Sequence, residues 1–517
     1  KVSNGAPNYH DQLVVLSLES GKVTPVYHPE PTFIGDVDLH FDGNKVLFTS
    51  FHGDAVNQPG NLQGKGFGVF ELALDPVTGA ARGEPRLITP EMGLDVDNYD
   101  ACYLPDGKII YGSTAGFQGV PCIGGNGDIA NLHVMNNDGT GIRRLTFDQE
   151  TNWSPYLMEN GRIMYQRWEY TDLSHFWSRI LFTMNPDGTD QRAYYGSNSW
   201  WPNSIFYAKS VPENPGLFTA VVSNHHGVQR AGQMILFDAA QGRKDADGVV
   251  QAIPGHGEEV EPIVIDRYFA GEWPKFLHPY PLSRNIHLAA VKLNASDHFG
   301  IYLVDVFDNL LPLKRSASYH YLEPIALKTR ETPPLIPERI DANATDATVV
   351  ISDIYSGEGL AGVPRGSVKK LRVFKYEFDP RKFGGHAQTG IQSGWDVKVI
   401  LGTVDVAEDG SVMFQVPCNT PISLQPLDAD GKALALMRSW MTAMPGEVLS
   451  CIGCHESQND APAPRSSMAL LAPRQTIQPW HGDTRGFSFL REVQPVLDRY
   501  CVGCHDGATE GRPNLAE

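Results

Sequence analysis

Two short motifs combine paired cysteines with a histidine at a spacing that suits metal chemistry. They are Cys451-Ile-Gly-Cys454-His455 and Cys501-Val-Gly-Cys504-His505. C-x-x-C-H is the attachment signature of c-type haem. Two thiols three positions apart form thioethers with the vinyl groups on one edge of the porphyrin, and the next histidine lies under the ring, where it binds the iron. The spacing therefore predicts two covalent haem c groups, with His455 and His505 as iron ligands.

Three other chemistries use paired cysteines, and each fits these motifs less well. A zinc site made of two C-x-x-C pairs usually has about 15–20 residues between them, and the gap in this chain is far longer. A thioredoxin-like motif is one C-x-x-C near a βαβ pattern, not two copies that are each followed by histidine. Disulfides within the motifs would leave both histidines without a role. Haem attachment explains the whole pattern.

The residues before the second motif predict the element that positions it. Apolar residues recur with helical spacing over residues 489–500, and this amphipathic helix would lead directly into Cys501. Such a helix packs on a haem edge in cytochrome c domains, although a plain core helix has the same pattern. Pro495 is expected to start or kink the helix. Residues 461–479 are rich in proline and predict a wrapping loop between the motifs.

A sixth ligand to one of the irons is expected from the loop between the motifs. His481 is the most attractive candidate, because few other histidines lie near either motif in the sequence. The alternatives are methionine thioethers, at Met437, Met441, Met444 and Met468. Methionine is more often a core residue than a ligand. Only 12 residues follow His505 in the 517-residue chain, so we expect no ligand from downstream within it.

Composition and charge exclude several classes of protein. The chain has 42 Lys plus Arg against 60 Asp plus Glu, which gives a formal net charge of −18. This balance argues against nucleic acid or an anionic membrane surface as the partner. No run of 18 apolar residues is present that could span a bilayer. The chain begins at Lys1 without a signal sequence. Because haem c is attached outside the cytoplasm, we expect an exported protein of the bacterial periplasm or an equivalent compartment, with its leader removed.

The first 330 residues repeat a pattern of apolar strands joined by Asp-Gly or Asn-Gly turns. The repeated units begin near residues 36, 98, 152, 200 and 261. Since propeller blades recur about every 40–50 residues, residues 1–330 predict a β-propeller of about six blades. A strand at residues 12–18 would complete the last blade and close the ring. A β-sandwich with long hairpins is the alternative.

The remaining residues predict two further parts. Residues 331–450 lose the repeat but keep alternating apolar runs, and they predict a smaller β-rich middle domain that leads into the first motif. Residues 451–517 would then be a dihaem c-type cytochrome region, mostly α-helix and loop. The predicted fold class is mainly β, with an N-terminal propeller, the middle domain and this C-terminal region.

An ordered series of segments extends over nearly the whole chain. It includes Gly119-Val-Pro-Cys122, Arg167-Trp-Glu-Tyr-Thr-Asp172, Tyr195-Gly-Ser-Asn-Ser-Trp-Trp-Pro-Asn-Ser-Ile-Phe-Tyr207, Phe276-Leu-His-Pro-Tyr-Pro281 and Gly300-Ile-Tyr-Leu-Val-Asp305. The segments that hold the two motifs, 445–456 and 493–505, continue the series. In this order the segments resemble the proteins related to the α subunit of hydrazine synthase. The resemblance implies a propeller, a middle β domain and a C-terminal dihaem region.

The resemblance also implies chemistry at the first motif. The best-understood member makes hydrazine from nitric oxide and ammonium, in a complex with other haem subunits. There, a tyrosine four residues after the motif histidine ligates the iron, and the histidine binds zinc with a cysteine and an aspartate. In this chain that position is Asn459, so we interpret His455 as the iron ligand. Cys122 and Asp38 are the candidate zinc ligands. A buried free cysteine and a turn-capping aspartate are the plainer interpretations of these two residues.

Two hypotheses of function follow. In the first, the haem at Cys451 and Cys454 is catalytic and takes a small nitrogen species such as nitric oxide or hydroxylamine, and the second haem relays electrons. In the second, both haems are six-coordinate, and the protein is an electron-transfer subunit of a multihaem complex. Both predict other c-type cytochrome subunits or a soluble electron carrier as partners, and the acidic surface favours a partner with a basic patch. A true hydrazine synthase would lie in the anammoxosome.

Overall fold

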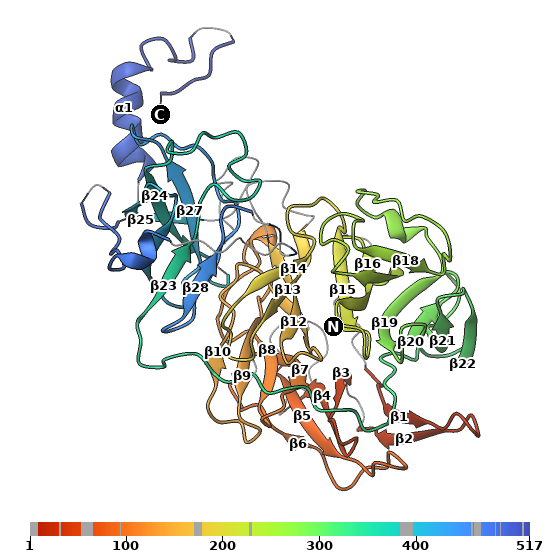
Figure 1. Cartoon of the computed structure of the whole chain (residues 1–517). Coiled ribbons are helices and arrows are strands. Elements are labelled where there is room, and N and C mark those ends of the chain that lie inside the picture. The colour runs from red at the N-terminus through yellow and green to blue at the C-terminus, as the bar shows by residue number, and fades with distance from the viewer. Residues whose placement is uncertain are drawn as a thin grey trace.

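The computed structural model describes residues 9–29, 33–52, 66–93, 95–169, 178–226, 230–382, 397–455, 457, 459, 467–480, 482–485, 488–508 and 511–516. Strands dominate these residues and the helical elements are short (Figure 1). The predicted mainly β class is therefore confirmed. Within the described ranges, no helix is both long and apolar enough to cross a membrane.

Residues 35–314 form a succession of antiparallel sheets. The strands of the first two sheets are β3 (Gly35–Leu39), β4 (Lys45–Phe51), β5 (Phe67–Ala73), β6 (Arg86–Leu87), and then β7 (Asn98–Tyr103), β8 (Ile109–Ser113), β9 (Asn131–Met135), β10 (Arg143–Arg144). The next two groups of four are β11 (Asn152–Leu157), β12 (Ile163–Glu169), β13 (Ser178–Met184), β14 (Arg192–Tyr195), and β15 (Ser204–Ser210), β16 (Leu217–Ser223), β17 (Gln233–Asp238), β18 (Val249–Ile253). A parallel pairing of Arg179 with Ser204 joins these two groups into one sheet. The last of the series is β19 (Lys275–Pro281), β20 (Ile286–Lys292), β21 (Gly300–Asp305), β22 (Leu310–Lys314).

The central strands of these sheets are buried on both faces. Every residue of β8, β9, β12 and β16 is buried, because each sheet packs between its neighbours in the series. Apolar runs of this kind, separated by Asp-Gly and Asn-Gly turns, produced the repeat seen in the sequence. Gly43, Gly107 and Gly161 occupy those turns with φ of 67°, 84° and 80°, values that glycine adopts without steric cost.

The first strand of each unit carries the same distortion. Six residues at equivalent positions have positive φ, between 48° and 57°: Asp36, Asp100, Ser154, Tyr207, His278 and Glu323. The strand pairing shifts register beside the first five of them, which marks a β-bulge in each inner strand. The side chains of all six line one central hollow. This shared centre gives the N-terminal part a propeller-like arrangement.

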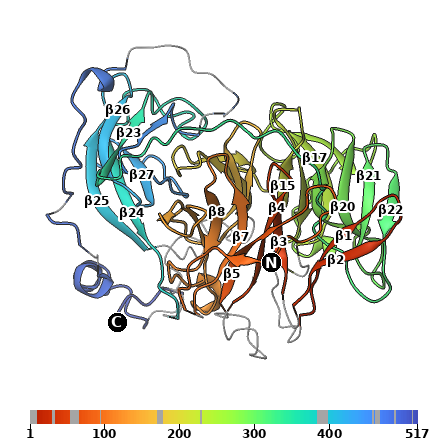
Figure 2. The ribbon, with the colours of Figure 1, turned by 90° about the horizontal axis from the view of Figure 1, so that it is seen from below.

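The N-terminal hairpin lies beside the end of this series. It contains β1 (Leu13–Leu16) and β2 (Val23–Tyr27), which pair in antiparallel fashion. Leu13 and Val26 pack into the same apolar cluster as Ile325 and Leu327. Both views show the hairpin between β3 and β22, the two ends of the series (Figures 1 and 2). The strand expected at residues 12–18 is therefore present, next to the segment that contributes Glu323.

The middle domain consists of two sheets that share one apolar core. In the described part of the chain one sheet has the order β26 (Val412–Pro417), β23 (Asp346–Ile351), β28 (Val448–Cys451), and the other β25 (Val397–Asp405), β24 (Lys370–Glu377), β27 (Ile422–Leu427). Val349, Val373 and Phe414 are central residues of the core. β28 runs parallel to β23, with Cys451 opposite Ile351. The first motif therefore continues directly from a strand of this domain.

A buried ion cluster joins the middle domain to the N-terminal sheets. The Nε of Arg167, on β12, lies 2.8 Å from Glu169 Oε1 and 3.3 Å from Asp148 Oδ1. The guanidinium lies 4.6 Å from the centre of the Trp440 ring, and its Nη2 donates to Trp440 O at 3.2 Å. Trp440 Nε1 in turn donates to Asp148 Oδ1 at 2.8 Å. These four residues, the Arg167 cluster, hold the chain after β27 against β12.

The C-terminal part is a short helical segment beside the middle domain (Figure 1). After η4 (Ala469–Leu471), a π-helical turn η5 (Phe489–Val493) continues into α1 (Gln494–Tyr500). The Ser488 side chain accepts a hydrogen bond from Arg491 N at 3.4 Å and begins η5. Pro495 lies in the first turn of α1, where its missing N–H needs no partner. The helix predicted over residues 489–500 is thus confirmed.

Candidate functional site

The first motif is packed against a loop of the middle domain. Cys454 N donates to Ser356 O at 2.8 Å, and Gly359 N donates to Cys454 O at 3.0 Å. A Cβ on Gly453 would lie 2.6 Å from Asp353 O and would also overlap Ser356 O. A Cβ on Gly359 would overlap Cys454 Sγ. The backbone of the loop and of the motif therefore approach each other more closely than side chains would permit.

The histidine of the first motif is bound to a residue of the N-terminal sheets. His455 Nδ1 lies 2.9 Å from Asn198 Nδ2. Asn198 belongs to the loop between β14 and β15 and has a φ of 54°, a left-handed conformation that asparagine tolerates better than most residues. Trp200, two positions on, has 53% of its surface exposed. Nδ1 is therefore engaged. With the amide turned so that Oδ1 faces the ring, Asn198 would accept from Nδ1–H, and Nε2 would be the ring nitrogen left for a metal.

Asn459, which stands where the resembled synthase has tyrosine, is bound elsewhere. Its Oδ1 accepts a hydrogen bond from Arg243 Nε at 2.8 Å, and its Nδ2 donates to Ala239 O at 3.0 Å. Arg243 also donates to Tyr194 O at 3.1 Å. Two loops of the N-terminal sheets thus hold the chain on both sides of residue 457. These contacts are consistent with His455, and not residue 459, as the ligand to a metal.

The second motif is held by residues close to it in the sequence. His505 N donates to Cys501 O at 3.0 Å, and Leu515 N donates to His505 O at 2.8 Å. His505 Nδ1 lies 3.3 Å from Pro513 O. A carbonyl can only accept, so Nδ1 carries the proton of this hydrogen bond and Nε2 keeps its lone pair. The turn at the end of α1, in which Cys504 N also donates to Cys501 O at 3.0 Å, brings the three motif residues together along the backbone.

Exposed apolar side chains surround the second motif. Val496 and Tyr500 on α1 are 52% and 70% exposed, and Phe489 and Leu490 on η5 are 55% and 60% exposed. Four large apolar residues on one short helical segment are unusual for an unliganded surface. A porphyrin attached at Cys501 would give them an apolar surface to cover. The thiol pairs, the imidazoles and this surface fit covalent haem.

The structure describes the other predicted metal ligands, His481, Cys122 and Asp38, to different extents. His481 lies outside the described residues, so its role as sixth ligand stays a prediction. Cys122 belongs to the short helix η2 (Pro121–Ile123), and its side chain is not among those described. Asp38 accepts a hydrogen bond from Tyr103 N at 3.0 Å and lies 3.7 Å from Arg330 Nη2. Across the described residues, no group of three or more His, Cys, Asp or Glu is arranged to hold a metal ion. The zinc site therefore stays a prediction.

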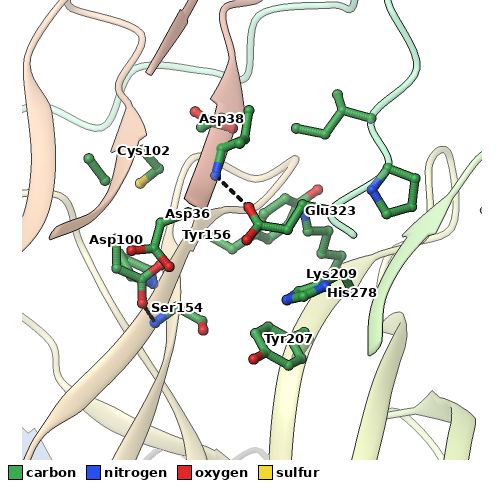
Figure 3. A pocket seen from close by; sticks show the side chains of 16 residues that line it. Asp36, Asp38, Asp100, Cys102, Ser154, Tyr156, Tyr207, Lys209, His278 and Glu323 are labelled. Carbon is green, nitrogen blue, oxygen red and sulfur yellow. Dashed lines mark hydrogen bonds between the residues drawn. The ribbon is translucent and has the colours of Figure 1, made fainter. Parts of the chain in front are cut away.

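Asp38 lines the central hollow, where carboxylates connect neighbouring units (Figure 3). Asp38 connects the first unit to the second through Tyr103 N. Asp100 Oδ2 accepts from Ser154 N at 2.6 Å, and Glu323 Oε2 accepts from Val37 N at 2.8 Å. The bonds to Ser154 N and Val37 N satisfy backbone N–H groups that lie within a bulge, and the bond to Tyr103 N satisfies one at the end of β7. The acidic residues of the hollow therefore have a structural role.

Burial and crowding of these carboxylates change their pKa values. Burial, with the charge of Asp36 nearby, raises the pKa of Asp100 to about 6 and that of Glu323 to about 7. Burial also lowers the pKa of Lys209 and raises that of the Cys102 thiol. A protonated carboxyl costs less to bury than an ionised one. The hollow is therefore more stable when Glu323 and Asp100 carry protons.

Asn198, Arg243 and Gly359 were not predicted as site residues from the sequence. Asn198 lies in the segment 195–207, which belongs to the series that carried the family resemblance, but nothing in its spacing connects it to His455 257 residues later. Gly359 has no motif around it. A glycine in a turn-rich loop was the one available signal, and it does not identify the partner.

Together the fold and the motifs define a class of protein: a propeller-like N-terminal part, a β-rich middle domain and a C-terminal segment, with two C-x-x-C-H motifs. Residues 366–456 match the family model described as the hydrazine synthase alpha subunit middle domain. This match and the fold support a hydrazine synthase alpha-related protein, as the resemblance predicted. No curated protein matches the chain.

Solved structures match the fold of the chain to different extents. Hydrazine synthase of Kuenenia stuttgartiensis is 16% identical, with a TM-score of 0.67 over 98% of this chain and 78% of that chain. A TolB structure from Agrobacterium tumefaciens is 12% identical, with a TM-score of 0.36 over 57% of this chain and 86% of that chain. The first match extends over all three parts of the chain, and at this identity it shows the fold.

Proposed function

We propose that the protein is a dihaem c-type redox protein of the hydrazine synthase alpha type. One observation carries the proposal. Each motif histidine has Nδ1 engaged, His455 by Asn198 and His505 by Pro513 O, and each directly follows a C-x-x-C pair, so Nε2 would be the ring nitrogen that binds the iron. This is the ligand set that a covalent haem requires. The exposed apolar residues of η5 and α1 support the same assignment.

The two sites would have different tasks. His455 is exposed, and it lies where loops of the N-terminal sheets meet the middle domain, so small molecules can reach this region. A haem at Cys451 and Cys454 would supply a one-electron iron couple and, with one face open, a position for nitric oxide, hydroxylamine or a related nitrogen species. The chain's own contribution is to orient His455 through Asn198. The second site, at the exposed end of the molecule, would relay electrons.

A second candidate function is electron transfer without catalysis. The contacts of Asn459 with Arg243 and Ala239 favour it, because the tyrosine ligand of the resembled synthase is replaced by an amide that is turned to other partners. In that case both irons would be six-coordinate, with His481 as a ligand to one of them. Both functions need a partner, either another c-type cytochrome or a soluble carrier, in the periplasm or an equivalent compartment.

The N-terminal part would have six blades in this proposal. Six positive-φ residues at equivalent positions support the count, and the sixth, Glu323, would belong to a blade completed by β1 and β2. Such a ring would give the first site a rigid wall, because the loop with Asn198 is fixed between two blades.

Haem counting tests the proposal. Protein matured in a host that attaches haem c should contain two haems per chain by the pyridine haemochromogen assay. C451S/C454S and C501S/C504S should each contain one. No covalent haem in the native chain would exclude the proposal.

Electron paramagnetic resonance of the ferric protein then separates the two functions. A high-spin signal that changes on addition of nitric oxide or hydroxylamine, and is lost in C451S/C454S, is expected for a catalytic first haem. Two low-spin signals that ignore both ligands would instead establish the electron-transfer function.

A further inference from the structure

The two motif histidines differ in the partner of Nδ1. His505 donates to a backbone carbonyl eight residues away, at 3.3 Å from Pro513 O. His455 meets the side-chain amide of Asn198, at 2.9 Å and 257 residues away. A backbone carbonyl cannot be changed by substitution, whereas a side chain can. The chain therefore uses a replaceable group from another domain at the first site.

The partner of Nδ1 affects the metal that Nε2 binds. When the group at Nδ1 accepts a proton more strongly, the imidazole becomes more electron-rich and stabilises the oxidised metal. For a ligating His455, Asn198 must accept from Nδ1–H through Oδ1, and a half-turn of its amide places Oδ1 in the position of Nδ2. A neutral amide is a weaker acceptor than a carboxylate.

The loop that carries Asn198 is fixed by contacts of the residues on either side of it. Ser199 Oγ donates to Trp201 O at 2.6 Å, and Gly196 N donates to Arg243 O at 2.8 Å. Trp201 is buried in the apolar core of the unit formed by β15 to β18. With the φ of 54° at Asn198, these contacts direct the amide toward the middle domain. The amide is therefore pre-positioned by the N-terminal sheets.

We propose that Asn198 is the positioning residue of the first haem: it fixes the ring of His455 and sets the reduction potential of the iron that His455 ligates. The inference rests on the proposed function, because it requires a haem at Cys451 and Cys454. It assigns control of a redox centre to a domain that contains no part of the attachment motif. The second haem, whose histidine has a local partner, is an internal control.

The test is a potentiometric titration of the dihaem protein, with N198D and N198A beside the native chain. In N198D the carboxylate accepts more strongly, and the first haem should move to a lower potential. In N198A the acceptor is lost, and the potential should rise. We expect at least a tenfold change in the reduction equilibrium for N198D, which corresponds to about 59 mV for one electron. The second haem should keep its potential in both variants. S197A, at an exposed position of the same loop, should leave both potentials unchanged.

Opposite shifts distinguish the inference from a merely structural role, since a disturbed loop would move both variants in one direction. The same titration in a C501S/C504S background, which keeps only the first haem, assigns the signal. Unchanged potentials in N198D and N198A, with two haems bound, would overturn the role of Asn198 alone. Absence of the first haem from the native chain would overturn the proposed function instead.

Discussion

The two C-x-x-C-H motifs are alike in sequence and opposite in construction. The first follows a strand of the middle domain, is hydrogen-bonded to residues 352–359, and reaches the N-terminal sheets through His455. The second follows α1, and in the described residues the hydrogen bonds of 488–516 stay within 485–516. The first motif is therefore a product of the whole tertiary structure, and the second is a local unit.

This difference determines which changes should affect which site. Substitutions in distant parts of the chain can alter the first motif, because three parts of the molecule meet there. The second motif should respond only to changes in its own segment. The predictions below test this separation, and each compares a site that should change with one that should not.

The largest effect is expected at the Arg167 cluster. Arg167→Met leaves the buried carboxylates of Asp148 and Glu169 without their cation, and breaking a buried ion pair in this way costs about 3–5 kcal/mol. We expect the docking of the middle domain to weaken, and the proposed first haem to become labile while the proposed second haem stays bound. Urea denaturation and haem counting on the same sample measure both. Equal loss of the two haems would contradict the separation. R474M, which removes an exposed ion pair with Asp346, is the control and should cost less than about 1 kcal/mol.

The next effect compares equivalent glycines of the two motifs. Gly453→Ala forces a Cβ against Ser356 O and Asp353 O, and overpacking of this kind costs about 1–3 kcal/mol. Gly503→Ala adds a Cβ with no heavy atom within 4 Å. We expect the haem content to fall toward one per chain in G453A and to stay at two in G503A. The same behaviour of both variants would mean that the first motif is not packed as described.

A smaller effect is expected from the pH dependence of the central hollow. Glu323 has a pKa of about 7 in the folded protein, above its ordinary value of about 4.3. The folded state therefore binds the proton more tightly than the unfolded chain, and stability falls as the pH rises from about 4 to 7. Glu323→Gln should remove this loss and raise the unfolding free energy at pH 8 relative to the native chain. Denaturant titrations at pH 5 and pH 8 measure the change.

The pH experiment has its own control and its own contrary result. Glu19→Gln changes an exposed glutamate near the β1–β2 hairpin and should leave the pH dependence as it is. The spectrum of the second haem should not respond to Glu323→Gln at either pH. If the unfolding free energy of E323Q still falls with pH as steeply as that of the native chain, the destabilisation would come from other groups of the hollow. Asp100 would be the first of these to test.

The smallest effect is expected from removal of the second motif. A chain that ends at residue 485 loses η5, α1 and the motif, yet it keeps the bonds of the first motif. We expect its unfolding free energy to change by less than about 0.5 kcal/mol and its first haem to remain. Scanning calorimetry compares the two chains. A large fall in the melting temperature would show that the C-terminal segment stabilises the rest of the protein.

The sequence predicted those features that depend on local chemistry. The turn glycines at 43, 107 and 161 and the apolar runs between them gave the units of the N-terminal part. Units expected near 36, 98, 152 and 200 have first strands that begin at Gly35, Asn98, Asn152 and Ser204. The unit expected near 261 begins at Lys275, because residues 254–274 form an irregular connection with η3 (Tyr268–Ala270).

Features that depend on distant contacts were not predictable. A bulge in an inner strand cannot be recognised from the alternation of apolar and polar residues in that strand. The position of the bulge depends on how the neighbouring unit is placed. The bond of Asn198 to His455 joins positions 257 residues apart. Nothing about an asparagine or a histidine in the sequence predicts that these two residues are in contact. The candidate ligands Cys451, Cys454, His455, Cys501, Cys504 and His505 could be named in advance because their chemistry is set by spacing alone.

The bond between Glu323 and Val37 N has a consequence for how the chain is made. It joins residues 286 positions apart, and the apolar cluster of Leu13, Val26, Ile325 and Leu327 joins similar extremes. The β1–β2 hairpin can therefore reach its final neighbours only when about 300 further residues of the chain are available to fold. Contacts of such long range slow folding and leave strand edges unprotected. Until those residues fold, the edges of β1 and β2 are open to pairing with another chain.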